Sequence, residues 1–164
     1  MKRTVILLLT LAVLSAAALI AYPPLKHWAL VQVGRGDGCT AQRAWAITAE
    51  KIELTRVKDD ILAKTKLIQK EPKGLELYQT PYGEFWAPEG SRYVLPFNLA
   101  EEATHIYGTG ERFVKKGDVV LDCGANVGTF ARFALDAGAK LVVAIEPAPD
   151  NLECLRRNFK KEIE

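Results

Sequence analysis

The segment from Val119 to Glu146 constrains the fold of this chain more than any other. A short apolar run, Val119–Leu121, leads into the glycine-rich stretch DCGANVG, and the next residues, FARFALDAGA, have the composition of a helix. A second apolar run, Leu141–Ile145, ends at Glu146, and another helix is expected from about Asp150. The order strand, glycine turn, helix, strand, acid, helix is typical of the opening of a doubly wound α/β domain with parallel strands.

The spacing of the glycines and the acid predicts an adenosine-containing ligand. Gly124 permits a sharp exit from the first strand and leaves the backbone open to a ligand, while Gly128 lets the next helix pack closely. Glu146 follows Gly128 by 18 residues, at the carboxyl end of the neighbouring strand. A carboxylate there can accept hydrogen bonds from both hydroxyls of a ribose. A simpler interpretation stays open, in which the glycines serve turn geometry alone and Glu146 is a solvated acid.

Two residues distinguish a binding site for a dinucleotide from one for S-adenosylmethionine. The dinucleotide fingerprint has glycine at its middle position, where this chain has Asn126. Asp122 stands two residues before Gly124, where a carboxylate repels a pyrophosphate but attracts an ammonium group; the alternative is that it caps the following helix. S-adenosylmethionine combines a ribose with a cationic amino-acid part and has no phosphate. We therefore expect S-adenosylmethionine as the cofactor, with a NAD-dependent oxidoreductase as the alternative.

The same segment closely resembles the FkbM-type family of S-adenosylmethionine-dependent methyltransferases. The resemblance rests on VVLDCGANVGTF, VVAIEPAPDNLECLRRNF and the upstream GERFVKKGD, and it covers about Tyr107 to Phe159. It implies a Rossmann-like class I methyltransferase fold and methyl transfer to an oxygen of a sugar or another small-molecule acceptor. It also implies that Glu146 holds the ribose, and that four residues line the methionine end of the cofactor: Asp122, Gly124, Asn126 and Gly128. No catalytic residue is assigned by it.

A long helix is expected before this segment. Thr40 is placed to cap a helix that runs to about Gln69. Its apolar residues recur every seven positions: Ile47, Leu54, Ile61 and Ile68. This stripe favours an amphipathic helix lying against its own domain or a membrane surface, with self-association through the stripe as the alternative.

Between the long helix and the glycine-rich segment, the sequence predicts a hairpin and a second helix. Leu75–Pro88 has β-favouring aromatic residues around a turn, in which Pro81 and Gly83 fit the second and fourth positions. A helix is expected over Leu95–Ile106.

The N-terminal residues predict attachment to a membrane. The apolar run Val5–Ala21 would span about 26 Å as a helix, close to the ~30 Å thickness of the hydrocarbon layer. A single-pass anchor is the favoured interpretation, and a cleaved signal peptide is the alternative because Lys2 and Arg3 form a basic start. That basic flank favours a domain outside the cell, whereas S-adenosylmethionine is a cytoplasmic metabolite, so the side of the membrane stays open.

Composition excludes several classes of protein. The 164 residues are 49% hydrophobic and 26% charged, which excludes a disordered chain. The net charge of +2 is accounted for by basic residues around the apolar leader, so binding to nucleic acid is not expected. Three widely spaced cysteines, Cys39, Cys123 and Cys154, predict neither a disulfide framework nor a metal site.

These observations divide the chain into four parts. Residues 1–25 are the anchor or signal segment, 26–74 a linker with the long helix, 75–110 the hairpin and second helix, and 111–164 part of a methyltransferase domain. Only two strands of the parallel sheet are recognisable, and two such strands leave apolar surface uncovered. The sequence therefore predicts an incomplete, N-terminal part of the domain that does not transfer methyl groups as an isolated chain. A non-enzymatic, membrane-tethered module is the remaining alternative.

Overall fold

The structure is a computed structural model that describes residues 2–35 and 38–163, and it shows a mixed α/β protein with two small sheets. The chain divides into two compact units, Met1–Glu53 and Leu54–Glu164, which are described separately. The sequence GRGDG at residues 34–38 predicts a flexible break, and part of it lies outside the described residues.

The first unit is helical. It contains α1 (Lys2–Ala21), α2 (Pro23–Gln32) and the start of α3 (Ala41–Lys64). Thr40 caps α3 as expected, because its Oγ1 accepts a hydrogen bond of 3.2 Å from the amide of Arg43. Among the described residues no single helix has the length and apolar composition needed to cross a membrane; the bent pair Arg3–Leu19 and Pro24–Gln32 meets both criteria together.

The long helix is shorter than predicted. It ends at Lys64, and Lys66–Lys70 forms strand β1 instead of a continuation to Gln69. The backbone of Lys66–Lys70 pairs with the neighbouring strand, so strand pairing replaces the last predicted helical turn. In the second unit the apolar stripe packs against its own domain in part: Ile61 is buried, and Leu54 and Val57 lie partly buried against the same core. Ile68, the last residue of the predicted stripe, lies on β1 and is exposed.

The expected hairpin is confirmed, within a sheet of three antiparallel strands. β1 pairs with β2 (Leu75–Thr80), which pairs with β3 (Gly83–Pro88). Thr80 faces Gly83 across a two-residue turn that contains Pro81, and Gly83 has a positive φ of 104°, a conformation that glycine adopts without steric cost.

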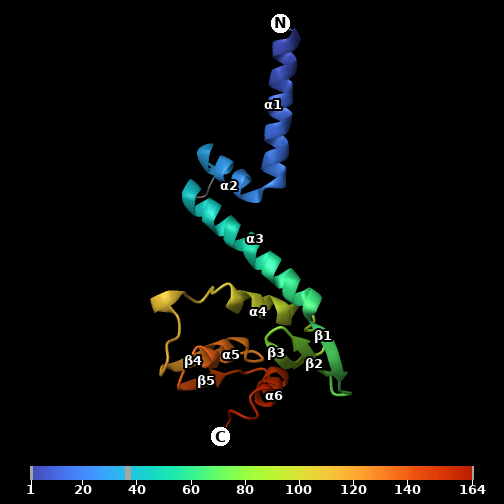
Figure 1. The fold of residues 1–164 in the computed structure, drawn as a ribbon, viewed down its shortest axis with the longest axis vertical. Helices are drawn as coiled ribbons and strands as arrows, with labels where there is room; N and C mark the ends of the chain where they lie inside the picture. Colours follow the sequence, from blue (N-terminus) through green and yellow to red (C-terminus); the bar gives the residue numbers. More distant parts are fainter. Residues whose placement is uncertain (1, 36–37, 164) are drawn as a thin grey trace. The chain divides into compact units, whose positions relative to one another are not determined.

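The second sheet is a parallel pair, as predicted. After α4 (Val94–Ala103) and a short 3-10 turn (Gly110–Arg112), β4 (Val119–Cys123) and β5 (Leu141–Ile145) run side by side, with α5 (Thr129–Asp136) between them in sequence and α6 (Pro149–Asn158) after them (Figure 1). The predicted helix over 95–106 ends three residues early, because His105 adopts a left-handed conformation with φ of 56°.

The two faces of the parallel pair differ. Val142 and Ala144 pack with Ala131 of α5 and Leu155 of α6 in a small core. The other face is apolar and exposed, since the side chains that alternate with these keep 44 to 67% of their surface: Val119, Leu121, Leu141, Val143 and Ile145. A larger core joins the antiparallel sheet to α3, α4 and α6.

Candidate functional site

The glycine turn at the carboxyl end of β4 is the centre of the site. The amides of Gly124 and Ala125 both donate hydrogen bonds to the carbonyl of Ile145, at 2.8 and 3.0 Å. Gly124 has a φ of 86°, and a Cβ built on it meets no other atom within 4 Å. The turn is therefore held to the end of β5 while its backbone stays open to an approaching ligand.

Glu146 is held directly against this turn. One carboxylate oxygen, Oε2, accepts a hydrogen bond of 2.8 Å from the amide of Asn126, and the other accepts one of 2.7 Å from the amide of Ala148. Asn126 is left-handed, with φ of 51°, a conformation that asparagine adopts more readily than most residues. The structure thus brings together the acid and the turn that the sequence placed 20 residues apart.

Gly128 has a different environment from Gly124. A Cβ at Gly128 would overlap the ring of Phe159 and the side chain of Leu155, so this glycine makes room for α6 and the residue that follows it. Its φ of 90° also requires glycine. It does not line the cavity described next.

A cavity of about 450 Å³ opens beside the turn. Three of the five predicted site residues line it, namely Asp122, Gly124 and Asn126. Among the described residues that line it, none is a lysine or arginine, and three are acidic. The acidic residues are Glu101, Glu102 and Asp122.

Two of these carboxylates have an oxygen buried without a partner. Asp122 Oδ2 and Glu102 Oε2 are shielded from solvent and make no hydrogen bond to any residue that the structure describes. Burial and the negative charge of nearby Glu146 raise the pKa of Asp122 above its usual value. Burial raises the pKa of Glu102 to about 7, with further contributions from the charges of Asp122 and Glu101. The cavity is therefore a region of negative potential, and none of the described residues that line it supplies a compensating cation.

Aromatic rings form another part of the cavity wall. Tyr107 and Phe130 both line it and meet edge to face, with ring centroids 5.3 Å apart. Burial and the surrounding carboxylates raise the pKa of Tyr107, so its hydroxyl stays protonated at neutral pH. Carboxylates together with aromatic faces form an environment suited to organic cations.

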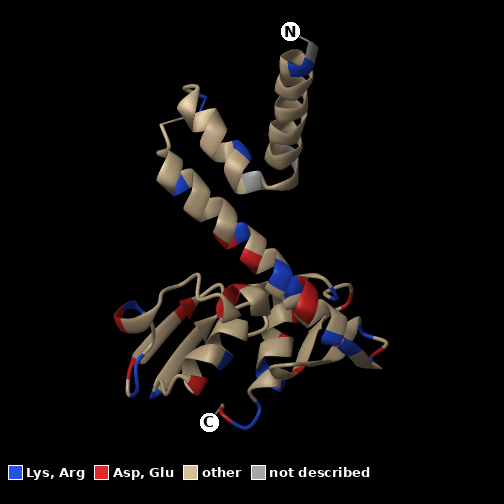
Figure 2. Cartoon of the chain, turned by 45° about the horizontal axis from the view of Figure 1, so that its top comes forward, with Lys and Arg blue, Asp and Glu red and all other residues tan. Residues whose placement is uncertain are grey.

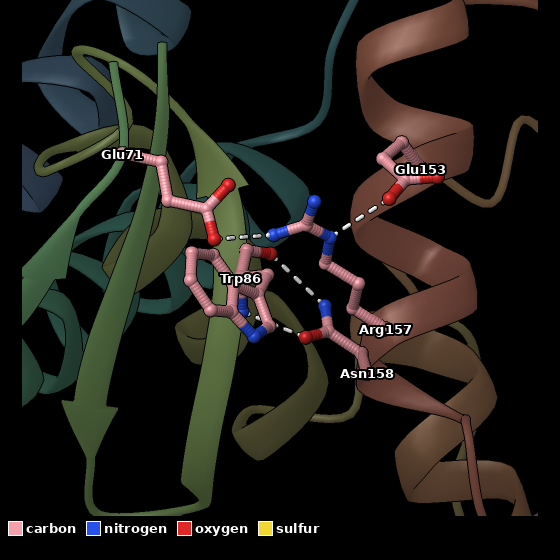
Figure 3. Close-up of polar contacts among 5 residues, drawn as sticks. All are labelled: Glu71, Trp86, Glu153, Arg157 and Asn158. Atoms are coloured by element: carbon pink, nitrogen blue, oxygen red, sulfur yellow. Dashed lines mark hydrogen bonds and ion pairs between the residues drawn. The ribbon is translucent and has the colours of Figure 1, made fainter. Parts of the chain in front are cut away.

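Asn158 of α6 binds both the glycine turn and β3. Its Nδ2 donates a hydrogen bond of 2.9 Å to the carbonyl of Val127, within the glycine turn. It also donates one of 3.0 Å to the carbonyl of Trp86 (Figure 3). Its Oδ1 accepts a hydrogen bond of 2.7 Å from the amide of Trp86. One side chain therefore connects the turn, α6 and the edge strand β3.

A second cavity, of about 610 Å³, lies between β3 and α6 and is the weaker candidate. Its two arginines are already in ion pairs: Arg132 with Glu162, and Arg157 with Glu71 and Glu153 (Figure 3). These arginines join structural elements and are not positioned to receive an anion.

Glu102 is the residue of the site that the sequence analysis did not identify. A usable signal exists, because Leu95, Leu99 and Glu102 follow the spacing i, i+4, i+7 of one helix face. A glutamate in such an apolar stripe is unusual, since burying a carboxylate without a partner is costly.

Comparisons with known proteins give no relative. Neither a protein-family model, nor a curated protein, nor a solved structure matches the chain. Within the described residues no group of three or more histidine, cysteine, aspartate or glutamate side chains is arranged to hold a metal ion.

Proposed function

We propose that this chain belongs to an S-adenosylmethionine-dependent methyltransferase with a Rossmann-like class I domain. The observation that supports this most is the bond between the amide of Asn126 and the carboxylate of Glu146. It fixes a strand-end acid beside an open glycine turn, at the shared carboxyl edge of two parallel strands. This edge is where open α/β sheets bind nucleoside ligands, and a strand-end acid there holds ribose hydroxyls.

The charge of the cavity favours S-adenosylmethionine over a dinucleotide. A pyrophosphate beside Asp122 and Glu102 would face carboxylates, with no basic side chain in the cavity wall to offset them. The sulfonium and ammonium groups of S-adenosylmethionine are cations, which these carboxylates and the nearby aromatic rings would attract. The NAD-dependent oxidoreductase is therefore the second candidate.

In the proposed reaction, S-adenosylmethionine supplies an electrophilic methyl group. The residues of this chain would hold the ribose at Glu146 and the amino-acid end near Asp122, with the backbone at Gly124 in close contact. Fixing the methyl group in line with an acceptor oxygen provides much of the rate in such a reaction. The acceptor class, a sugar or another small metabolite, rests on the resemblance to FkbM-type enzymes.

We also propose that the N-terminal segment attaches the chain to a membrane. The large apolar side chains from Val5 to Leu14 each keep more than half of their surface exposed, so no described part of the first unit buries them. Figure 2 shows that α1 carries no charged residue beyond its first turn.

Isothermal titration calorimetry of the full chain tests the cofactor. We expect binding of S-adenosylhomocysteine, no binding of NAD, and an affinity for S-adenosylhomocysteine at least about tenfold lower in Glu146→Gln, because a ribose hydrogen bond to a charged acceptor is weakened. Glu84→Gln, an exposed substitution on β3 with the same change of charge, is the control and should bind normally. Binding of NAD alone would favour the oxidoreductase, and binding of neither ligand would favour the non-enzymatic module.

A further inference from the structure

Glu102 is a buried acid that the glycine motif does not include. It lies near the end of α4, and only 4% of its surface is exposed. It lines the cavity beside the glycine turn, and its Oε2 makes no hydrogen bond within the described part of the chain. An unpaired buried carboxylate costs folding free energy, so its presence points to a partner that binds from outside the chain.

The surroundings of Glu102 define the chemistry of that partner. Asp122 lines the same cavity with its own unpartnered oxygen, and its charge acts on Glu102. Among the described residues, no basic side chain lines the cavity and no group of acids is arranged to hold a metal ion. A small organic cation with several N–H donors would satisfy both carboxylates, as an alkylammonium group does.

We propose that Glu102, together with Asp122, binds the α-ammonium group of the cofactor's amino-acid part. This inference rests on the proposed function, and it adds a positioning residue from α4 to a site otherwise built by β4, β5 and the turn between β4 and α5. The ammonium group would donate hydrogen bonds to the oxygens that are unpaired in the chain alone. Glu102 would then fix the methionine end, while Glu146 fixes the ribose.

Ligand binding should be coupled to proton release. Without a ligand, Glu102 is about half protonated near pH 7. An ammonium group beside it favours the ionised form, so the proton leaves when the ligand binds. The described titratable groups that act on this site are Glu101 on α4, Tyr107 after it, Asp122 on β4 and Glu146 after β5.

The test compares two ligands that differ in the amino-acid part. S-adenosylhomocysteine carries the ammonium group, whereas 5′-methylthioadenosine has the same nucleoside and thioether without it. In calorimetry on the full chain, we expect Glu102→Gln to lower the affinity for S-adenosylhomocysteine about tenfold or more, because a charge-assisted hydrogen bond is lost. The affinity for 5′-methylthioadenosine should stay within about twofold of its value in the unmodified chain. Glu84→Gln is the control for the change of charge.

Proton release supplies an independent measurement on the unmodified chain. Calorimetry at pH 7 in buffers of different ionisation enthalpy should show a net release of protons with S-adenosylhomocysteine, and none with 5′-methylthioadenosine. Equal losses for both ligands in Glu102→Gln, or no proton release in the unmodified chain, would overturn the inference. If neither ligand binds the unmodified chain, the proposed function itself is wrong, and the inference fails with it.

Discussion

Gly124 and Gly128 have almost the same backbone conformation but different neighbours. Both have φ near 90°, yet an added Cβ meets open space at Gly124 and the side chains of Leu155 and Phe159 at Gly128. We predict that Gly128→Ala lowers the free energy of unfolding by about 3 kcal/mol, because strain and overpacking act together, and that Gly124→Ala lowers it by about 1 kcal/mol from strain alone. Urea denaturation measures both values. Equal losses of unfolding free energy in the two variants would show that the close contact of Gly128 with Leu155 and Phe159 does not affect stability.

The buried Glu102 predicts an unusual pH dependence of stability. Its pKa is raised from 4.5 to about 7 in the folded chain, so the folded state binds more protons than the unfolded state between these values. Stability from this group is complete below about pH 4.5 and is lost as the pH rises through 7, a loss of about 2 to 4 kcal/mol. Glu102→Gln should therefore be more stable than the unmodified chain at pH 8 and similar to it at pH 4.5. Urea unfolding at the two pH values measures this, and an equal difference at both would contradict it.

At the residue scale, the sequence was sufficient for the parts of the site that lie in one continuous segment. The glycine turn, Asp122 and Glu146 were predicted because all three lie at or just after the carboxyl ends of two apolar strands. Glu102 was not, since its position in the cavity depends on how α4 packs against α5, a long-range contact that no local pattern encodes. The separation of Gly128 from the cavity depends in the same way on α6.

At the scale of elements, one side chain connects α6 to the antiparallel sheet. Asn158 makes two hydrogen bonds to Trp86 and one to Val127. We predict that Asn158→Ala lowers the free energy of unfolding by about 2 to 3 kcal/mol, because it leaves backbone groups at a sheet edge and in the turn without partners. Asn151→Ala, in the first turn of the same helix, removes no side-chain hydrogen bond that the described residues show and should change stability by less than about 0.5 kcal/mol. Urea denaturation compares the pair, and similar values would show that Asn158 has no such role.

Elements with a strong local pattern were predicted well. The hairpin has turn residues at fixed positions, and β5 was predicted with its exact bounds from its apolar run. β1 was missed, because its residues are all exposed and its sequence, KLIQK, has the composition of a helix surface. Lys66–Lys70 forms a strand because its backbone pairs with the edge of β2, and β2 lies outside this segment of the sequence.

At the scale of the whole molecule, we predict that the N-terminal segment determines whether the chain is recovered with membranes. If the N-terminal segment is embedded in a bilayer, the full chain should stay in the pellet after alkaline carbonate extraction of membranes. Leu11→Arg, in the middle of α1, should shift it to the supernatant, because arginine at that depth costs about 3 kcal/mol. Gln42→Arg in α3 is the matched control and should not change the distribution. Intact mass distinguishes a retained anchor from a cleaved signal peptide, and recovery of the unmodified chain in the supernatant would contradict membrane attachment.

The contacts of Asn158 and Arg157 also set an order for events during synthesis. They join partners 72 and 86 residues apart in the chain, so the hairpin leaves the ribosome long before the residues that hold it in place. Translation proceeds from the N-terminus, and the carbonyl of Val127 lacks its hydrogen bond from Asn158 until Asn158 has emerged. A nascent chain should therefore acquire its binding turn late, in one step with the docking of α6.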